Sequence, residues 1–277
     1  MYGRGERSGY SLVSLLLNKK PYSKKRGVRW LKSKAIAALV VALFLLGIVA
    51  IAVPVNATTT KFNGLTYFAK VTIQTEADAL PSDINALGFD IGVLVDGNGI
   101  VVNERIVHDA TQFGIAVDGS SSVDVTGCEI YNIGFHSGSV FAPNGMQYGN
   151  AIYYCYSSGV VSGNNVHTYQ KGGIISNYLF GGEILCVQDN TVNGLGPVSF
   201  IAQNGIQIGY EQKAVVTGNA VSNNYYVDVT VSPKGKAIGQ QTWVSCGILM
   251  YSVHPNECEV SQNILRGNQV QIYMYPA

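Results

Sequence analysis

Basic residues are scarce in this chain beyond Ala57. The whole sequence has 18 Lys and Arg and 17 Asp and Glu, but ten of the basic residues and a single acid, Glu6, lie in residues 1–34. The rest carries eight basic and 16 acidic residues, a formal net charge of about −8. Because phosphate binding requires a basic patch, this balance argues against nucleic acid or an anionic lipid surface as a partner. It also disfavours a strongly anionic polysaccharide, unless calcium bridges the two.

The sequence also lacks the Cys-x-x-Cys spacing that is typical of zinc sites, and no metal site is predicted. Its five cysteines, an odd number, are Cys128, Cys155, Cys186, Cys246 and Cys258. Most of them are expected to be buried small apolar residues. The pattern leaves open one disulfide between neighbouring repeats.

Helical periodicity and a Leu-x-x-Leu-x-Leu frame are absent, and a different short pattern recurs instead. Its clearest copy, residues 205–221, has alternating apolar residues that predict two short strands, followed by the turn residues Thr217-Gly218-Asn219. Aligned on the asparagine, five copies place Cys128, Asn164, Asn190, Asn219 and Asn263 in one column. A second column, two positions later, holds Ile130, Val166, Val192, Val221 and Leu265. A third column, three positions earlier, holds Val125, Val161, Val187, Val216 and Val260.

Another short strand precedes each copy. Its inward side chains are predicted to be Ile115/Val117, Ile152/Tyr154, Ile174/Ser176, Ile206/Ile208 and Ile248/Met250. A sixth copy, residues 89–106, aligns with residues 113–130 at one offset that stays constant along the whole copy. This alignment matches Val101 with Val125 and Ile106 with Ile130.

A period in the low twenties, with two or three short strands per repeat, predicts an all-β fold: a single-stranded, right-handed parallel β-helix of about six coils. A β-sandwich would not keep an asparagine in register. On these columns the sequence resembles the parallel β-helix repeat family of pectate-lyase-like and other carbohydrate-associated secreted proteins. The asparagines at one corner are expected to stack as a structural ladder, formed by Asn164, Asn190, Asn219 and Asn263.

The N-terminal part predicts export. After the basic segment, residues 35–53 form an apolar run without any charged residue, which is long enough to cross a hydrocarbon core as a helix. The basic flank is expected to stay in the cytoplasm, so the repeats are predicted to be extracellular or on the cell surface. Residues 1–57 are interpreted as a leader with a signal peptide cleaved after Ala57, the alternative being an uncleaved membrane anchor. Residues 58–88 are expected to cap the first coil, and residues 89–277 to form the β-helix.

The outward residues of the first strands predict the floor of a binding site. The longest insertions all follow the same column, so their loops are expected at one edge of that sheet, where loops border the saccharide cleft in the family that the sequence resembles. Five residues are predicted to contact a polysaccharide: Tyr153, Tyr251, Asp118 and Asn177 of the floor, and Trp243 of a loop. The alternative is that the aromatic rings cover the loops' own small cores.

The evidence for catalysis is weaker. The floor supplies one acid, Asp118, and no base, whereas a lyase of this family needs calcium-binding carboxylates and a basic residue, and a hydrolase needs two carboxylates. The family's catalytic signatures are missing from the matching positions, and the four histidines share no column. Binding of a neutral or mildly charged polysaccharide is therefore the predicted function. A loop-built lyase or hydrolase site, for example His136 with Asp118, stays an alternative. No cofactor is predicted, apart from calcium as the candidate for a lyase-like site.

A rival prediction comes from a different class of protein. The sequence ends on an apolar strand, Gln269 to Tyr275, with no cap after it. Unpaired strand edges invite pairing with another chain. The alternative function is thus a structural cell-surface subunit that stacks end to end.

Overall fold

A computed structural model describes residues 58–276, except residue 63 and residues 135–147, 179–181 and 228–243. The leader at residues 1–57, with its charge-free run, lies outside these residues. Within the described part, no helix has the length and hydrophobicity needed to span a membrane. The described residues belong to one compact unit, residues 52–277.

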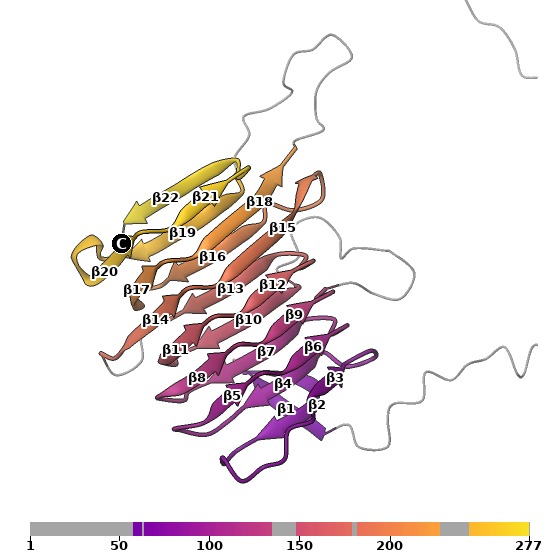
Figure 1. Cartoon of the computed structure of the whole chain (residues 1–277). Coiled ribbons are helices and arrows are strands. Elements are labelled where there is room, and N and C mark those ends of the chain that lie inside the picture. The colour runs from indigo at the N-terminus through magenta and orange to yellow at the C-terminus, as the bar shows by residue number, and fades with distance from the viewer. Residues whose placement is uncertain (1–57, 63, 135–147, 179–181, 228–243, 277) are drawn as a thin grey trace, which may run out of the picture. The chain divides into compact units, whose positions relative to one another are not determined.

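Three sheets contain the strands of the described residues, and most neighbouring strands are parallel (Figure 1). The first sheet has nine strands, in the order β1 (Thr58–Phe62), β2 (Leu65–Ile73), β4 (Ile91–Val95), β7 (Phe113–Asp118), β10 (Asn150–Cys155), β13 (Gly172–Asn177), β16 (Asn204–Gly209), β19 (Cys246–Val253) and β22 (Val270–Pro276). The second sheet has six, β20 (Cys258–Ser261), β17 (Lys213–Thr217), β14 (Ile184–Gln188), β11 (Gly159–Ser162), β8 (Val123–Thr126) and β5 (Val101–Asn103). The third has seven, β21 (Ile264–Arg266), β18 (Ala220–Tyr226), β15 (Thr191–Val198), β12 (Asn165–His167), β9 (Glu129–Tyr131), β6 (Ile106–His108) and β3 (Asp83–Asn85). One short 3-10 helix, η1 (Pro255–Glu257), precedes β20.

The chain passes from the first sheet to the second and the third, and then returns to the first sheet one strand further along. Six complete coils follow from this order, from β4–β5–β6 to β19–β20–β21. The strands are short because the chain must turn a corner between one sheet and the next. The number of coils agrees with the prediction from the repeats.

The core lies inside the coils, where equivalent apolar residues stack. Ile152, Ile174, Ile206 and Ile248 are paired in register in the first sheet, and all are fully buried. Each such side chain contributes about 1.5–3 kcal/mol relative to an exposed one. One coil alone could not bury these faces, so stacking of the coils is what stabilises the fold.

The register predicted for the first coil is wrong. Val93 pairs with Ile115, Val102 with Val125 and Val107 with Ile130, so the true offset between these two coils is shorter than the predicted one by one or two positions. Val101 and Ile106, aligned with inward residues by the sequence pattern, point outward and are 51% and 38% exposed. A shift by one residue moves a strand's side chains to the opposite face.

The asparagines at the corner before the third sheet are joined by hydrogen bonds. Nδ2 of Asn164 donates to Oδ1 of Asn190, Asn190 donates in the same way to Asn219, and Asn219 to Asn263, each at 2.9 Å. Each of these side chains also donates to a valine carbonyl oxygen of an earlier coil, as Asn164 does to Val125 at 2.9 Å. The ladder therefore satisfies backbone groups that the turns would otherwise leave buried and unpaired.

Residues 58–88 form a hairpin and also extend two of the three sheets of the β-helix. β1 and β2 form an antiparallel hairpin, β2 continues the first sheet beside β4, and β3 continues the third sheet beside β6. Residues 76–80, between β2 and β3, form turns and bends without a helix. The expected cap is thus an incomplete coil with a hairpin in front of it.

Candidate functional site

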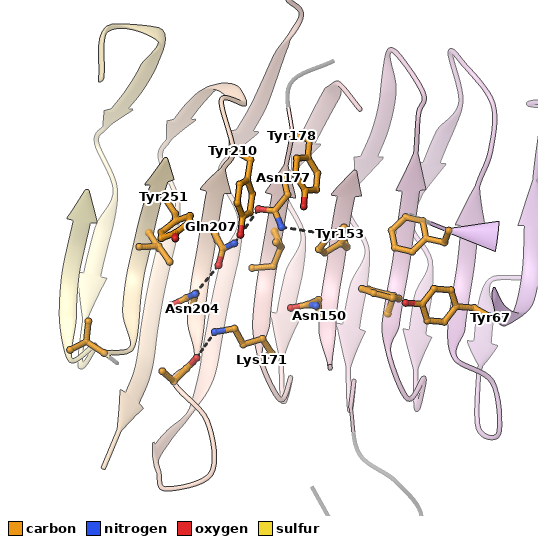
Figure 2. Close-up of a pocket in the computed structure, with 16 residues that line it drawn as sticks. Tyr67, Asn150, Tyr153, Lys171, Asn177, Tyr178, Asn204, Gln207, Tyr210 and Tyr251 are labelled. Atoms are coloured by element: carbon orange, nitrogen blue, oxygen red, sulfur yellow. Dashed lines mark hydrogen bonds between the residues drawn. The ribbon is translucent and has the colours of Figure 1, made fainter. Parts of the chain in front are cut away.

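A groove of about 490 Å³ lies on the outer face of the first sheet (Figure 2). Outward side chains of β10, β13, β16 and β19 form its floor. Residues that precede these strands, among them Lys171, Ala202 and Val244, form one side. This is the face on which the sequence analysis expected a binding floor.

The hairpin closes one end of the groove. The ring of Phe62, from β1, packs edge-on against Phe113 and Tyr153, at centroid distances of 5.0 and 5.5 Å. Leu94 of β4 and Ala116 of β7, which also point outward from the first sheet, are fully buried in this apolar cluster. The open floor therefore begins only at Tyr153. The turn signal Asn63-Gly64 between two β-rich runs is the sequence feature that predicts such a hairpin, and the sequence analysis missed it.

Three amide side chains cross the floor in one hydrogen-bonded row (Figure 2). Asn204 Nδ2 donates to Gln207 Oε1 (2.9 Å), and Gln207 Nε2 donates to Asn177 Oδ1 (3.1 Å). Asn177 Nδ2 in turn donates to the hydroxyl oxygen of Tyr153 (3.0 Å). The hydroxyl hydrogen of Tyr153 keeps its ability to donate, and burial raises the pKa of this phenol well above its ordinary value. The row holds its amides in fixed positions, and burial keeps the Tyr153 phenol uncharged.

Lys171 is the cation of the groove. It directly precedes β13, is partly buried, and donates from Nζ to the carbonyl oxygen of Ala202 (2.7 Å). Burial lowers the pKa of Lys171 to about 8, while the nearby Cys246 acts weakly in the opposite direction. Among the described residues that line the groove there is no Asp or Glu. Beside Lys171, Oδ1 of Asn204 is buried and has no hydrogen-bond partner.

Tyrosines stack along the turn at the other side of the groove. Tyr156, Tyr178 and Tyr210 each follow the last residue of a first-sheet strand, and neighbouring rings lie 4.7 and 4.8 Å apart, nearly parallel. All three have positive φ, which suits the tight turn that they begin. Tyr251 continues the row edge-on to Tyr210 at 5.5 Å. The first three were missed, although the sequence shows a Tyr directly after three successive strands.

The structure brings together some of the residues predicted to bind polysaccharide and not others. Tyr153, Tyr251 and Asn177 line the groove. Asp118 ends β7 and is partly buried outside the groove lining. Trp243 lies outside the described residues, as does His136. Lys171, Asn204 and Gln207 were not among the predicted site residues. Gln207 occupies the same outward register position as Tyr153 but was not selected, whereas Asn204 begins its strand and Lys171 precedes its strand, where the alternation does not say which way a side chain points.

Two of the histidines do share a column, contrary to the sequence analysis. The rings of His108, Tyr131 and His167, each ending a third-sheet strand, are stacked at 4.9 and 5.3 Å. His108 also contacts two carboxylates, Asp109 at 2.7 Å and Asp83 at 3.1 Å. The wrong offset in the first coil hid this column. No cluster of His, Cys, Asp and Glu in the described part could hold a metal ion, and the five cysteines form no disulfide.

Comparison with known families decides the classification. A family model described as "Right handed beta helix region" matches residues 82–276. The chain belongs to this right-handed β-helix family. No curated protein sequence matches the chain. Among solved structures, the Dettilon tailspike protein is similar to this chain, with 14% identity and a TM-score of 0.40. The match covers 66% of this chain and 35% of the tailspike chain. This chain thus spans about a third of the tailspike's length.

Proposed function

We propose that this β-helix is an extracellular or cell-surface protein that binds a polysaccharide along the groove of its first sheet. The observation that carries the proposal is the row of Asn204, Gln207 and Asn177 on an open floor bordered by tyrosines. Fixed amides and phenol hydroxyls are the groups that bind the many hydroxyls of a sugar, since each can donate and accept. The groove crosses successive strands, so similar groups recur along it at about 4.8 Å.

The tyrosine stack limits how the groove can contact a sugar. Both faces of the Tyr178 ring are covered, by Tyr156 and Tyr210. The ring of Tyr153 is enclosed by Phe62 and Phe113. To a sugar, these phenols therefore offer their ring edges and hydroxyl groups, not their ring faces. Tyr251, which is 38% exposed, is the floor residue best placed for apolar contact with a sugar ring.

Binding without cleavage fits the described residues better than hydrolysis. A glycoside hydrolase needs two carboxylates across the scissile bond, and the described groove lining has none. A lyase needs a base near the substrate, and Lys171 is the one described groove residue whose lowered pKa suits that role. The test of the proposal must therefore also detect cleavage.

The purified full-length chain should retain at least one polysaccharide from a broad glycan panel, without releasing new reducing or unsaturated ends. The same labelled glycan should bind intact cells that produce the chain, if the β-helix is exported. Retention with product formation would replace this proposal by an enzymatic one. Absence of retention across the panel would contradict saccharide binding, and binding only after cell lysis would contradict the location.

A second candidate function, end-to-end assembly, is favoured by β22. Ile272 and Met274 occupy the inward register positions of Ile248 and Met250, yet they are 46% and 43% exposed. In the described part of the first sheet no strand lies beyond β22. Exposed core positions on a free strand edge can pair with a second copy of the chain.

If this second function holds, light scattering of the full-length chain should show assemblies larger than a monomer. Met274→Lys should dissociate these assemblies, because it places a charge in the proposed contact between β22 and a second copy of the chain. Ile184→Lys, on β14 in the middle of the second sheet and 51% exposed, is a control for the added charge. A monomer at all concentrations would remove this candidate.

A further inference from the structure

The charge of Lys171 has no counter-charge in the described part of the chain. Its Nζ donates one hydrogen bond, to a neutral carbonyl, which leaves two of the three N–H donors of an ammonium group for other partners. A partly buried cation without an acidic partner is unfavourable for the free protein. Unfavourable charges of this kind are kept mainly where they contact a ligand.

The backbone fixes Lys171 in the wall of the groove. The N–H of Lys171 donates to the carbonyl oxygen of Gly149 (2.9 Å), and the N–H of Asn204 donates to that of Lys171 (3.0 Å). The next residue, Gly172, pairs in register with Asn150 on one side and Asn204 on the other. Figure 2 shows the Lys171 side chain between these two asparagines. The ammonium group thus faces the groove between amides of neighbouring coils.

Gly172 keeps this wall open. A Cβ at this position would lie 2.7 Å from Oδ1 of Asn150 and 2.4 Å from Cδ1 of Ile175. The buried Oδ1 of Asn204, which lacks a partner, shows that the same wall also has one unused acceptor.

We infer that Lys171 is an anion subsite of the groove, which binds the carboxylate of one acidic sugar unit in a chain whose neighbouring units are neutral. The inference rests on the proposed saccharide binding. A single ammonium group balances a single carboxylate, and the rest of the described lining consists of amides, phenols and apolar groups. A polyuronate, with a carboxylate on every unit, would leave the other charges unbalanced in the groove of an acidic protein.

The test compares acidic glycans with their own carboxyl-reduced forms on the full-length chain. The panel contains glycans with one acidic unit per repeat, polyuronates and neutral glycans. For the best binder, reduction of the carboxyl group should weaken binding about 10- to 100-fold, as expected for a charge-assisted hydrogen bond. Lys171→Gln should lower affinity for the acidic form by the same factor and leave that for the reduced form unchanged.

Lys213→Gln is the matched control, because Lys213 lies on β17 of the second sheet, away from the groove, and pairs with Glu257 of η1. It should leave both affinities unchanged. Equal binding of acidic and reduced forms would overturn the anion subsite while supporting saccharide binding. If a polyuronate bound most tightly, the inference that the ligand has one acidic unit among neutral units would be wrong. Absence of binding to every glycan would overturn both proposals.

The wild-type protein offers a second readout that needs no variant. Since burial lowers the pKa of Lys171 to about 8, the fraction of charged Lys171 falls as the pH rises through this value in the free protein. Affinity for the acidic glycan should therefore fall above about pH 8, with the midpoint moved upward by the bound carboxylate, and affinity for the reduced glycan should stay flat. The thiol of Cys246, whose pKa burial raises to about 11, stays neutral in this window, and so does the phenol of Tyr153, whose pKa burial also raises. Parallel pH profiles for the two glycans would contradict the subsite.

Discussion

Replacing Asn164 with Leu should destabilise the protein by about 3 kcal/mol, because the change leaves two buried backbone groups unpaired. The side chain of Asn164 accepts from the N–H of Cys128 (2.9 Å) and donates to the carbonyl oxygen of Val125 (2.9 Å). Leucine has the same number of side-chain heavy atoms, branched at the same carbon, but can supply neither bond. Urea unfolding followed by circular dichroism measures the loss as a lower midpoint.

The adjacent residue is the matched control for the asparagine ladder. Asn165 is exposed on β12, where its side chain points away from the core. Asn165→Leu should change the stability by less than about 0.5 kcal/mol, as is usual for exposed positions. Equal losses of stability for the two variants would contradict a stabilising role of the asparagine ladder.

Filling the groove should abolish saccharide binding. Gln207→Trp places a large ring at the centre of the floor and removes the hydrogen bonds of Gln207 with Asn177 and Asn204. Affinity for the best-retained glycan should drop by about 100-fold or more, equivalent to roughly 3 kcal/mol. The position faces outward on the sheet, so the fold should tolerate the ring. Calorimetric titration measures the affinity, and circular dichroism checks the fold.

Val215→Trp controls for a bulky ring on an outward strand position. Val215 lies on β17 in the second sheet and is partly buried, like Gln207. Its substitution should leave glycan affinity unchanged. If both variants bind normally, the glycan does not occupy the groove; if both fail, the loss reflects damage to the fold.

The asparagine and valine columns made the fold predictable because each performs one repeated physical task. The buried valines must all face inward, and every asparagine of the ladder must satisfy the same turn atoms, so both recur at fixed positions from coil to coil. Neither task depends on distant parts of the chain. The outward residues of the floor followed directly from the alternation, which is why Tyr153, Asn177 and Tyr251 were found.

The first coil was misaligned because apolar residues stand next to each other there. Val101 and Val102, and likewise Ile106 and Val107, are equally suited to either face, so alternation cannot choose between them. The hydrogen-bonded register chooses Val102 and Val107. This error of one residue also separated His108 from Tyr131 in the alignment, although the two rings are stacked.

The closed end and the wall of the groove could not be predicted from the repeat pattern. The hairpin of β1 and β2 closes one end through Phe62, whose partner Phe113 lies two coils further along the chain. Lys171 lies just before its strand, where the pattern does not say which way a side chain points. The side-chain positions of such residues depend on the packing of segments outside the repeat, so the repeat pattern cannot predict them.

Tyrosine footprinting with hydroxyl radicals tests saccharide binding in the groove most directly. Tyr210 and Tyr251 line the groove and are 41% and 38% exposed, whereas Tyr131 lies on the third sheet, between His108 and His167. With the best-retained glycan bound to the full-length chain, the account predicts lower oxidation of Tyr210 and Tyr251 and unchanged oxidation of Tyr131. Protection of Tyr131, or unchanged oxidation of both groove tyrosines at a saturating glycan concentration, would contradict it.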